Sequence, residues 1–208
     1  MALAKDPLNL IITGVGGQGN ILASQLTATA GIGQQLYASI GETYGASQRG
    51  GSVMSHVRFS REFQYGPLIP EGEADVILGF EPLETLRVLV DFGNDATHVI
   101  FNDRPNYPIS VLSGQAKYPE LAVILGRIKE LAASARIIKA TDLAHELGTL
   151  VAQNVVMVGA LAASELLPVP PAAFEQTIAE LFEDQGKREF NLQAFRLGVR
   201  GYQEGQAL

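Results

Sequence analysis

A glycine-rich segment near the start of the chain has the spacing of an anion-binding loop. Gly14, Gly16 and Gly19 match the pattern G-x-G-x-x-G, and Gly17 and Gln18 lie between them. In such a loop the glycines allow a tight turn and let a phosphate approach the backbone. The N-terminus of the following helix then offers free N–H groups to the anion. These five residues are therefore our candidates for cofactor binding.

Three interpretations of this glycine loop remain open. A site for NAD or FAD also needs an acidic residue about 20 residues further on. Glu42 lies well beyond that spacing from Gly14, inside a segment rich in glycine, so it fits poorly. The loop can instead bind another anion, or a cofactor held partly by a partner chain. In the third interpretation it is a tight strand-to-helix turn that binds nothing.

A second polar loop contains Tyr44 and the run Gln48-Arg49-Gly50-Gly51. An arginine beside two glycines can present its forked guanidinium to a carboxylate or a phosphate. We therefore predict Arg49 and Gln48 as catalytic residues, and Tyr44, Gly50 and Gly51 as cofactor-binding residues. We expect this loop to follow a second βα unit, at the carboxyl ends of the strands and close to the glycine loop.

Structural alternatives accompany these candidates. Arg49 would only shape its loop if it paired with a carboxylate such as Glu42. His56, in the predicted strand Ser52–Phe59, is a third candidate catalytic residue, although a lone histidine in a strand is more often structural. Asn154 opens an otherwise apolar helix, where it is expected to act as a helix cap; the alternative is that it faces the site.

The elements that must position these residues alternate between strands and helices over most of the chain. Short apolar runs predict strands at Leu8–Thr13, Ser52–Phe59, Ala74–Phe80, Thr97–Phe101 and Arg136–Lys139. Helical patterns are predicted at Asn20–Ala30 with Asn20 as N-cap, Pro82–Val90, Glu120–Ala132, Thr141–Leu147, Gln153–Leu166, Ala172–Phe182 and Asn191–Tyr202. This order favours a three-layer α/β/α sandwich with a mainly parallel, Rossmann-like sheet and a helical C-terminal flank. We expect one domain over residues 1–208.

Composition excludes several classes of function. The chain has 208 residues, a net charge of −7 and no cysteine, with three histidines. Disulfides, thiolate catalysis and zinc sites built on cysteine are therefore excluded, and so is a conventional iron–sulfur cluster held by this chain. We predict no metal site, no nucleic-acid partner and no membrane partner. The first residues lack the pattern of a signal peptide, so we expect a cytoplasmic protein.

The ordered set of motifs resembles the gamma subunit or domain of the 2-oxoacid:ferredoxin oxidoreductases, also called the pyruvate/ketoisovalerate oxidoreductase gamma domain. The matching segments are Gly14–Gly19 (GVGGQG), Tyr44-Gly45, Gln48–Gly51, Ser55–Arg58, Ala74–Val76, Asn154, Gly159–Leu161, Asn191, Ala194-Phe195 and Gly198. The sequence of the second loop is most similar to that of the beta subunit of indolepyruvate:ferredoxin oxidoreductases.

The resemblance implies a reaction and a set of partners. A 2-oxo acid, for this subfamily indolepyruvate, loses CO2 on thiamine diphosphate, iron–sulfur clusters take the electrons to ferredoxin, and coenzyme A receives the acyl group. The resemblance places thiamine diphosphate and the clusters on a large cysteine-rich partner subunit, so this chain holds no cofactor alone and is inactive alone. The two loops would line one wall of a composite site and position the substrate carboxylate or a phosphate of coenzyme A. The alternatives are a stand-alone NAD- or FAD-binding oxidoreductase and a purely structural assembly subunit.

Overall fold

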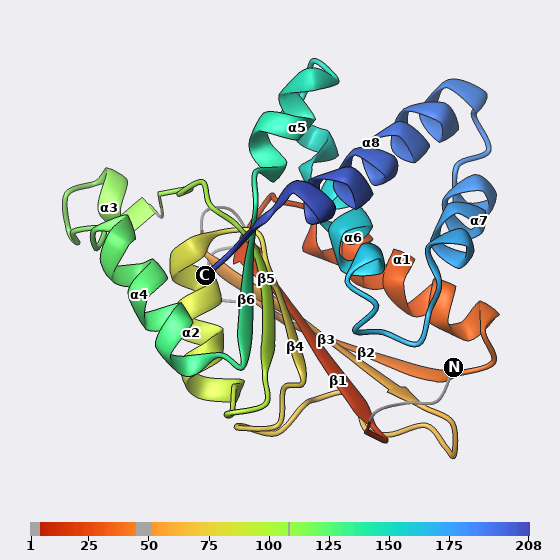
Figure 1. The fold of residues 1–208 in the computed structure, drawn as a ribbon, viewed down its shortest axis with the longest axis horizontal. Helices are drawn as coiled ribbons and strands as arrows, with labels where there is room; N and C mark the ends of the chain where they lie inside the picture. Colours follow the sequence, from red (N-terminus) through yellow and green to blue (C-terminus); the bar gives the residue numbers. More distant parts are fainter. Residues whose placement is uncertain (1–4, 45–50, 108) are drawn as a thin grey trace.

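The computed structural model describes residues 5–44, 51–107 and 109–208. A seven-stranded sheet lies at its centre, with helices on both faces (Figure 1). The strands are β1 (Leu8–Val15), β2 (Tyr37–Tyr44), β3 (Ser52–Ser60), β4 (Val76–Gly79), β5 (His98–Asn102), β6 (Ser134–Ile138) and β7 (Gln206–Ala207). Their order across the sheet is β2-β3-β1-β4-β5-β6-β7. The predicted α/β fold class is confirmed.

The parallel part of the sheet is its centre, where β1, β4, β5 and β6 lie side by side. All residues of β1 and β4 are buried, as expected for strands covered by helices on both faces. The antiparallel strands lie at the two edges: β3 pairs with β1, β2 pairs with β3, and β7 pairs with β6. The sheet is therefore mixed, with a parallel centre.

Strand β2 corrects the sequence prediction, which had placed Tyr44 in a polar loop. Residues up to Tyr44 are paired with β3, in a register that sets Gly41 against His56 and Tyr44 against Val53. The glycine in this strand lies beneath a neighbouring segment, because a Cβ at Gly41 would be 3.0 Å from the Pro67 carbonyl oxygen. A glycine where another backbone approaches closely is a known feature of strands.

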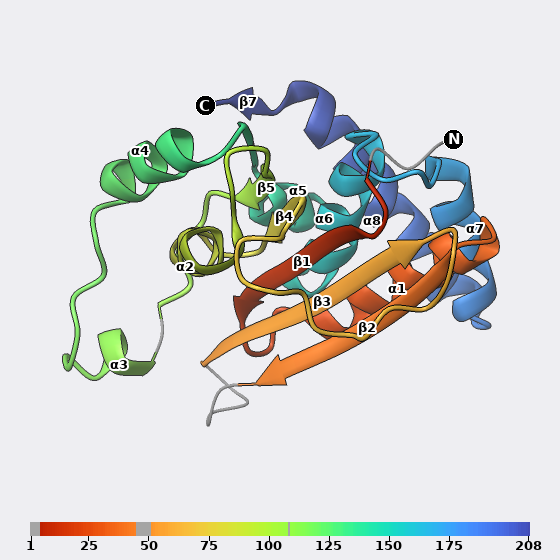
Figure 2. The same cartoon turned by 90° about the horizontal axis from the view of Figure 1, so that it is seen from below.

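Two helical layers cover the sheet (Figures 1 and 2). The helices are α1 (Asn20–Gly33), α2 (Pro82–Phe92), α3 (Ile109–Leu112), α4 (Leu121–Leu131), α5 (Ala140–Glu146), α6 (Gln153–Ala163), α7 (Pro171–Leu181) and α8 (Gln185–Glu204), with a 3₁₀ turn η1 (Leu150–Ala152). Helices α1, α6, α7 and α8 lie on one side of the sheet, and α2 and α4 lie on the other. The helical C-terminal flank is thus present as α6 to α8. Within the described part of the chain, no helix is long and apolar enough to cross a membrane.

Alternate residues of β1 reach the two cores. Leu10 and Ile12 belong to the larger apolar cluster, together with residues of α1, α6 and α8. Ile11 belongs to the smaller cluster, together with residues of α2 and α4. Because side chains alternate along a strand, β1 is held from both faces, which fixes the point at which its carboxyl end opens into the glycine loop.

Two glycines allow α6 and α8 to pack with their backbones in contact. A Cβ at Gly198 of α8 would overlap the carbonyl oxygen of Val156 in α6. A Cβ at Gly159 of α6 would overlap the carbonyl oxygen of Phe195 in α8. This close packing holds the start of α6, and with it Gln153 and Asn154, against the ends of the central strands.

Candidate functional site

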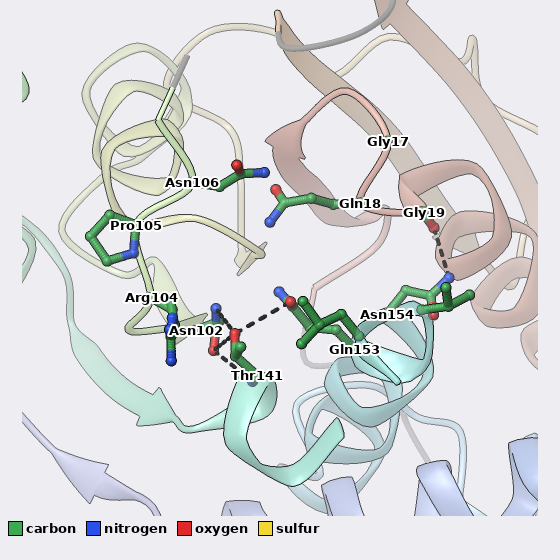
Figure 3. Close-up of a pocket in the computed structure, with 12 residues that line it drawn as sticks. Gly17, Gln18, Gly19, Asn102, Arg104, Pro105, Asn106, Thr141, Gln153 and Asn154 are labelled. Atoms are coloured by element: carbon green, nitrogen blue, oxygen red, sulfur yellow. Dashed lines mark hydrogen bonds between the residues drawn. The ribbon is translucent and has the colours of Figure 1, made fainter. Parts of the chain in front are cut away.

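A pocket of about 380 Å³ opens where the parallel strands end (Figure 3). The residues that line it are Gly17, Gln18, Gly19, Asn102, Arg104, Pro105, Asn106, Thr141, Leu150, Val151, Gln153 and Asn154. They come from the β1–α1 loop, the end of β5, the segment that follows β5, the start of α5, η1 and the start of α6. This is the edge of an open α/β sheet at which ligands bind.

The glycine loop adopts a backbone conformation that requires glycine at two positions. Gly17 has a φ of 104° and Gly19 a φ of 87°, both in the left-handed region. Gly19 is the N-cap of α1, so the predicted cap at Asn20 is wrong: Asn20 Nδ2 instead donates to the Ile12 carbonyl at 3.3 Å. The first amides of α1 have no acceptor within the helix and give this end partial positive charge.

The Gln18 side chain closes the loop on itself. Its Oε1 accepts from the Val15 N–H at 2.7 Å, and its Nε2 donates to the Phe80 carbonyl at 3.2 Å. The amide therefore links the end of β1 to the end of β4. In this structure Gln18 is a brace that shapes the loop, and its side chain also lines the pocket.

The Phe80 carbonyl is the meeting point of three side-chain amides. Besides Gln18, it accepts from Asn102 Nδ2 at 3.4 Å and from Gln153 Nε2 at 3.3 Å. Asn102 Nδ2 also donates to the Thr141 hydroxyl at 3.1 Å. In Figure 3, Asn102, Thr141 and Gln153 lie close together below the glycine loop, and Gln18 lies above them. The network joins β4, β5, α5 and α6, so it fixes the polar wall before any ligand arrives.

Among the described residues that line this pocket, Arg104 is the one charged side chain. Its guanidinium is 3.7 Å from the Asp142 carboxylate, and both side chains are more than half exposed. An ion pair that is so exposed contributes little to stability. The cation is therefore available to a ligand, and with the N-terminus of α1 it makes the pocket favourable for an anion.

A second pocket, of about 390 Å³, lies beside the same loop. Gly16, Gly17, Gly19, Asn20, Ile21, Glu42 and Val53 line it. Glu42 belongs to strand β2 rather than to a loop. Its carboxylate accepts from the hydroxyls of Ser24 at 2.9 Å and Ser55 at 2.5 Å. These two bonds join β2 to α1 and β3.

The second predicted loop ends beside the glycine loop, at Gly51. Strand β3 runs antiparallel to β1, so Ser52 pairs with Val15, and the Gly51 carbonyl accepts from the Gly16 N–H at 2.8 Å. The predicted closeness of the two loops therefore holds at Gly51. The β2–β3 connection achieves it, however, and not a second βα unit.

Several predicted site residues lie at the edge of the described residues or outside them. The backbone of Tyr44 ends β2 opposite Val53. Gln48, Arg49 and Gly50 lie outside the described residues. Their predicted roles therefore stay predictions.

His56 lies in the middle of β3, away from the residues that line the pocket. The residue is 2% exposed, and its Nδ1 accepts from the Ile69 N–H at 3.2 Å. Its ring packs edge-on against Phe92, with the centroids 5.6 Å apart. Burial, and then the nearby Arg58 cation, lower the pKa of His56, so the imidazole is neutral near pH 7. The structure does not bring His56 together with the glycine loop.

Sequence reasoning missed Arg104, Asn102, Thr141 and Gln153 as site residues. The signal for two of them was present, because the run Asn102-Asp103-Arg104-Pro105 directly follows a predicted parallel strand. Thr141 was expected only as the start of a helix, but in the first turn of α5 its N–H donates to Asn102 Oδ1 at 3.2 Å. Asn154 was expected as a cap, but it lines the pocket, with Nδ2 3.5 Å from the Gly19 carbonyl oxygen.

Comparison with known proteins identifies relatives over nearly the whole chain. Residues 9–201 match the family model described as pyruvate ferredoxin/flavodoxin oxidoreductase. The indolepyruvate oxidoreductase subunit IorB of Archaeoglobus fulgidus is 39% identical over 191 residues, which cover 92% of this chain and 93% of that protein.

Two solved structures have a similar fold. Pyruvate oxidoreductase subunit PORC from Thermotoga maritima matches with a TM-score of 0.67 and 22% identity, covering 97% of this chain and 98% of that chain. The 2-oxoglutarate:ferredoxin oxidoreductase from Magnetococcus marinus, solved with 2-oxoglutarate, coenzyme A and succinyl-CoA bound, matches with a TM-score of 0.72 and 22% identity. That match covers 95% of this chain and 31% of that chain.

Proposed function

Because the chain belongs to the pyruvate ferredoxin/flavodoxin oxidoreductase family, we propose that it is the small subunit of an indolepyruvate:ferredoxin oxidoreductase. The proposed reaction is the oxidative decarboxylation of an aryl 2-oxo acid to its acyl-CoA. The relative from Archaeoglobus fulgidus supports this substrate, since it is an indolepyruvate oxidoreductase subunit of nearly the same length.

The proposed holoenzyme uses thiamine diphosphate, iron–sulfur clusters and coenzyme A, which supply decarboxylation, electron transfer to ferredoxin and acyl transfer. The residues of this chain do not fit a conventional iron–sulfur cluster, because the chain has no cysteine. We therefore assign the clusters and thiamine diphosphate to a large cysteine-rich partner subunit. What remains for this chain is to bind and orient an anionic or amide-bearing part of a ligand.

The pocket at the strand ends is suited to that role. The backbone of Gly17 and Gly19, at the N-terminus of α1, and the Arg104 guanidinium can hold a phosphate of coenzyme A or the carboxylate of the 2-oxo acid. The carboxamides of Asn106 and Gln153 offer both donors and acceptors to uncharged polar groups. The pairing of a left-handed glycine loop with one cation is the observation that carries the proposal.

The rim of this site supports a partner subunit that covers it. Val151 is 81% exposed and Leu150 is 51% exposed, and both line the first pocket. Ile21, 46% exposed, lines the second pocket on the other side of the loop. Large aliphatic side chains at the mouth of a polar pocket are expected to be buried by a partner. Once they are buried, water is excluded and the electrostatic interactions in the pocket are stronger.

The role of the cation is tested by Arg104→Gln in the assembled oxidoreductase. The variant is expected to raise the KM for coenzyme A or for indolepyruvate about tenfold, as for one lost charge-assisted hydrogen bond. Arg127→Gln is the matched control, because that arginine is 64% exposed and lies on α4. Equal KM values for the two variants would contradict the assignment.

The second loop is tested in the same assay. We expect Arg49→Ala to lower turnover while the complex still assembles. Normal kinetics in this variant would remove Arg49 from the site. If the variants of Arg49 and Arg104 impaired assembly instead of turnover, the chain would be a purely structural subunit.

Docking of the partner is tested by Val151→Asp, which is expected to weaken assembly. Val123→Asp is its control, since Val123 is 57% exposed and lies on α4, beyond the pocket. Unchanged assembly of the Val151 variant would show that the partner binds elsewhere.

One observation favours a second candidate, a stand-alone NAD- or FAD-binding oxidoreductase. Glu42 lines a pocket with the glycine loop, near the place where a dinucleotide site has its acidic residue. Both of its oxygens already accept from serine hydroxyls, which explains the residue without a ligand. Titration of the isolated chain with NAD and with FAD separates the two candidates.

A further inference from the structure

A buried carboxylate follows β4 and lies behind the residues that line the pocket. Glu81 follows Phe80, whose carbonyl receives the amides of Gln18, Asn102 and Gln153. Glu81 is 0% exposed and is not among the residues that line the pocket. A fully buried carboxylate is costly unless hydrogen bonds compensate it, so its partners show what the residue does.

Three donors from separate segments converge on this carboxylate. Oε2 accepts from the Glu84 N–H at 2.9 Å, which caps α2. Oε1 accepts from the Tyr118 hydroxyl, and the backbone N–H of Asn106 donates to the same carboxylate. Asn106 itself lines the pocket. Glu81 therefore connects the start of α2 with a residue of the pocket wall.

Asn106 lies before α3 and Tyr118 lies after it, on the two arms of one excursion of the chain between β5 and α4. This excursion leaves the sheet after β5, carries α3, and returns to α4. Figure 2 shows α3 standing away from the sheet, so the excursion is anchored where its arms leave and rejoin the body. The Tyr107 and Tyr118 rings also meet edge to face, with centroids 5.1 Å apart. The carboxylate of Glu81 is the shared acceptor that joins these arms to the sheet.

Glu84 lies beside Glu81 and is almost as buried. Its side chain is 2% exposed, and its Oε1 is 3.7 Å from the Arg87 guanidinium. Burial raises the pKa of the Glu81 carboxyl, and the Glu84 carboxylate adds to this effect, whereas the three donors oppose it. The three donors are in turn held in place by the two carboxyl oxygens.

We propose that Glu81 is a positioning residue: its buried carboxylate fixes Asn106 and the Asn102–Asn106 wall against the glycine loop and so sets the affinity of the pocket for its ligand. The inference rests on the proposed function for the identity of that ligand. Glu81 touches no ligand itself, because it lies behind the wall. The position of Asn106 depends on the acceptor oxygens of Glu81 as well as on the size of its side chain.

The test is Glu81→Gln in the assembled oxidoreductase, with Tyr118→Phe as the second variant. Glutamine preserves the volume but replaces one acceptor oxygen by a donor, so at least one of the three donors loses its partner. We expect the KM for coenzyme A or for indolepyruvate to rise about tenfold, with kcat at saturation within about twofold. Tyr118→Phe removes one donor and leaves the carboxylate, so its KM should rise less.

Hydrogen exchange provides the structural readout. The amides of residues 103–107 and 109–118 should exchange faster in Glu81→Gln, while those of β1 and β4 stay protected. Glu130→Gln is the control, because that carboxylate is 61% exposed on α4. A KM equal to that of the control overturns the inference, whether or not exchange in the excursion becomes faster.

Failure of the inference is distinguishable from failure of the proposed function. If Arg104→Gln raises the KM and Glu81→Gln does not, the pocket binds the ligand but Glu81 does not position it. If neither variant changes the KM for either ligand, the pocket has been assigned wrongly and both proposals fail.

Discussion

Two glycines of the same loop differ in what a methyl group would meet, and this difference is measurable. Gly17 and Gly19 both have positive φ, so alanine at either position costs about 1–2 kcal/mol in backbone strain. A Cβ at Gly17 meets nothing within 4 Å. A Cβ at Gly19 would overlap the amide nitrogen of Asn154 and lie 2.9 Å from its Cγ. Gly19→Ala therefore adds a steric cost, which in packed sites is about 1–3 kcal/mol.

Urea unfolding of the isolated chain measures these costs. We expect Gly19→Ala to lower the free energy of unfolding by about 2–5 kcal/mol, and Gly17→Ala by about 1–2 kcal/mol. The double variant Gly19→Ala/Asn154→Ala should recover most of the steric part, because only a 3.1 Å contact with the Asn154 Cβ then remains. Equal costs for the two single variants would show that the contact with Asn154 adds no steric cost. So would a double variant that loses the sum of its single effects.

Two further predictions concern the packing and the histidine. Gly198→Ala should destabilise the chain by about 1–3 kcal/mol, since the new methyl group overlaps the backbone of α6. Gly126→Ala in α4 places a methyl group where it meets nothing, and it should stabilise the chain by about 0.5–1 kcal/mol. Thermal unfolding of the two variants compares these effects. Because the folded pKa of His56 is lowered, the unfolded chain binds a proton first, so stability is lost as pH falls below about 6.5. The His56→Gln variant should lose less stability on acidification than the unchanged chain, and its turnover near pH 7 should be unchanged. Reduced turnover would restore His56 as a catalytic candidate.

The local sequence was sufficient for the parallel centre of the sheet. Runs such as Leu8–Thr13 and Ala74–Phe80 are apolar without alternation, and strands of this kind are stable only when helices cover both faces. Strand β2 escaped prediction because its residues include glycine and polar side chains, and its pairing with β3 is a tertiary effect. Strand β7 has only two residues, so it gives no periodic signal.

Sequence patterns predicted only some of the residues of the candidate site. The glycine loop has a pattern of its own, whereas Asn102, Thr141 and Gln153 join it only because the topology brings the ends of β4 and β5 beside the starts of α5 and α6. No spacing in the sequence relates Gln18 to the Phe80 carbonyl. Glu81 was missed for a similar reason, since its donors Asn106 and Tyr118 are set by the excursion around α3.

We propose that this chain works as the small subunit of an indolepyruvate:ferredoxin oxidoreductase. Anaerobic purification of the chain from its native source, followed by identification of what accompanies it, tests this most directly. We expect a brown complex with a large cysteine-rich subunit that reduces a viologen dye with indolepyruvate and coenzyme A. A colourless chain that purifies alone and binds NAD or FAD would contradict it.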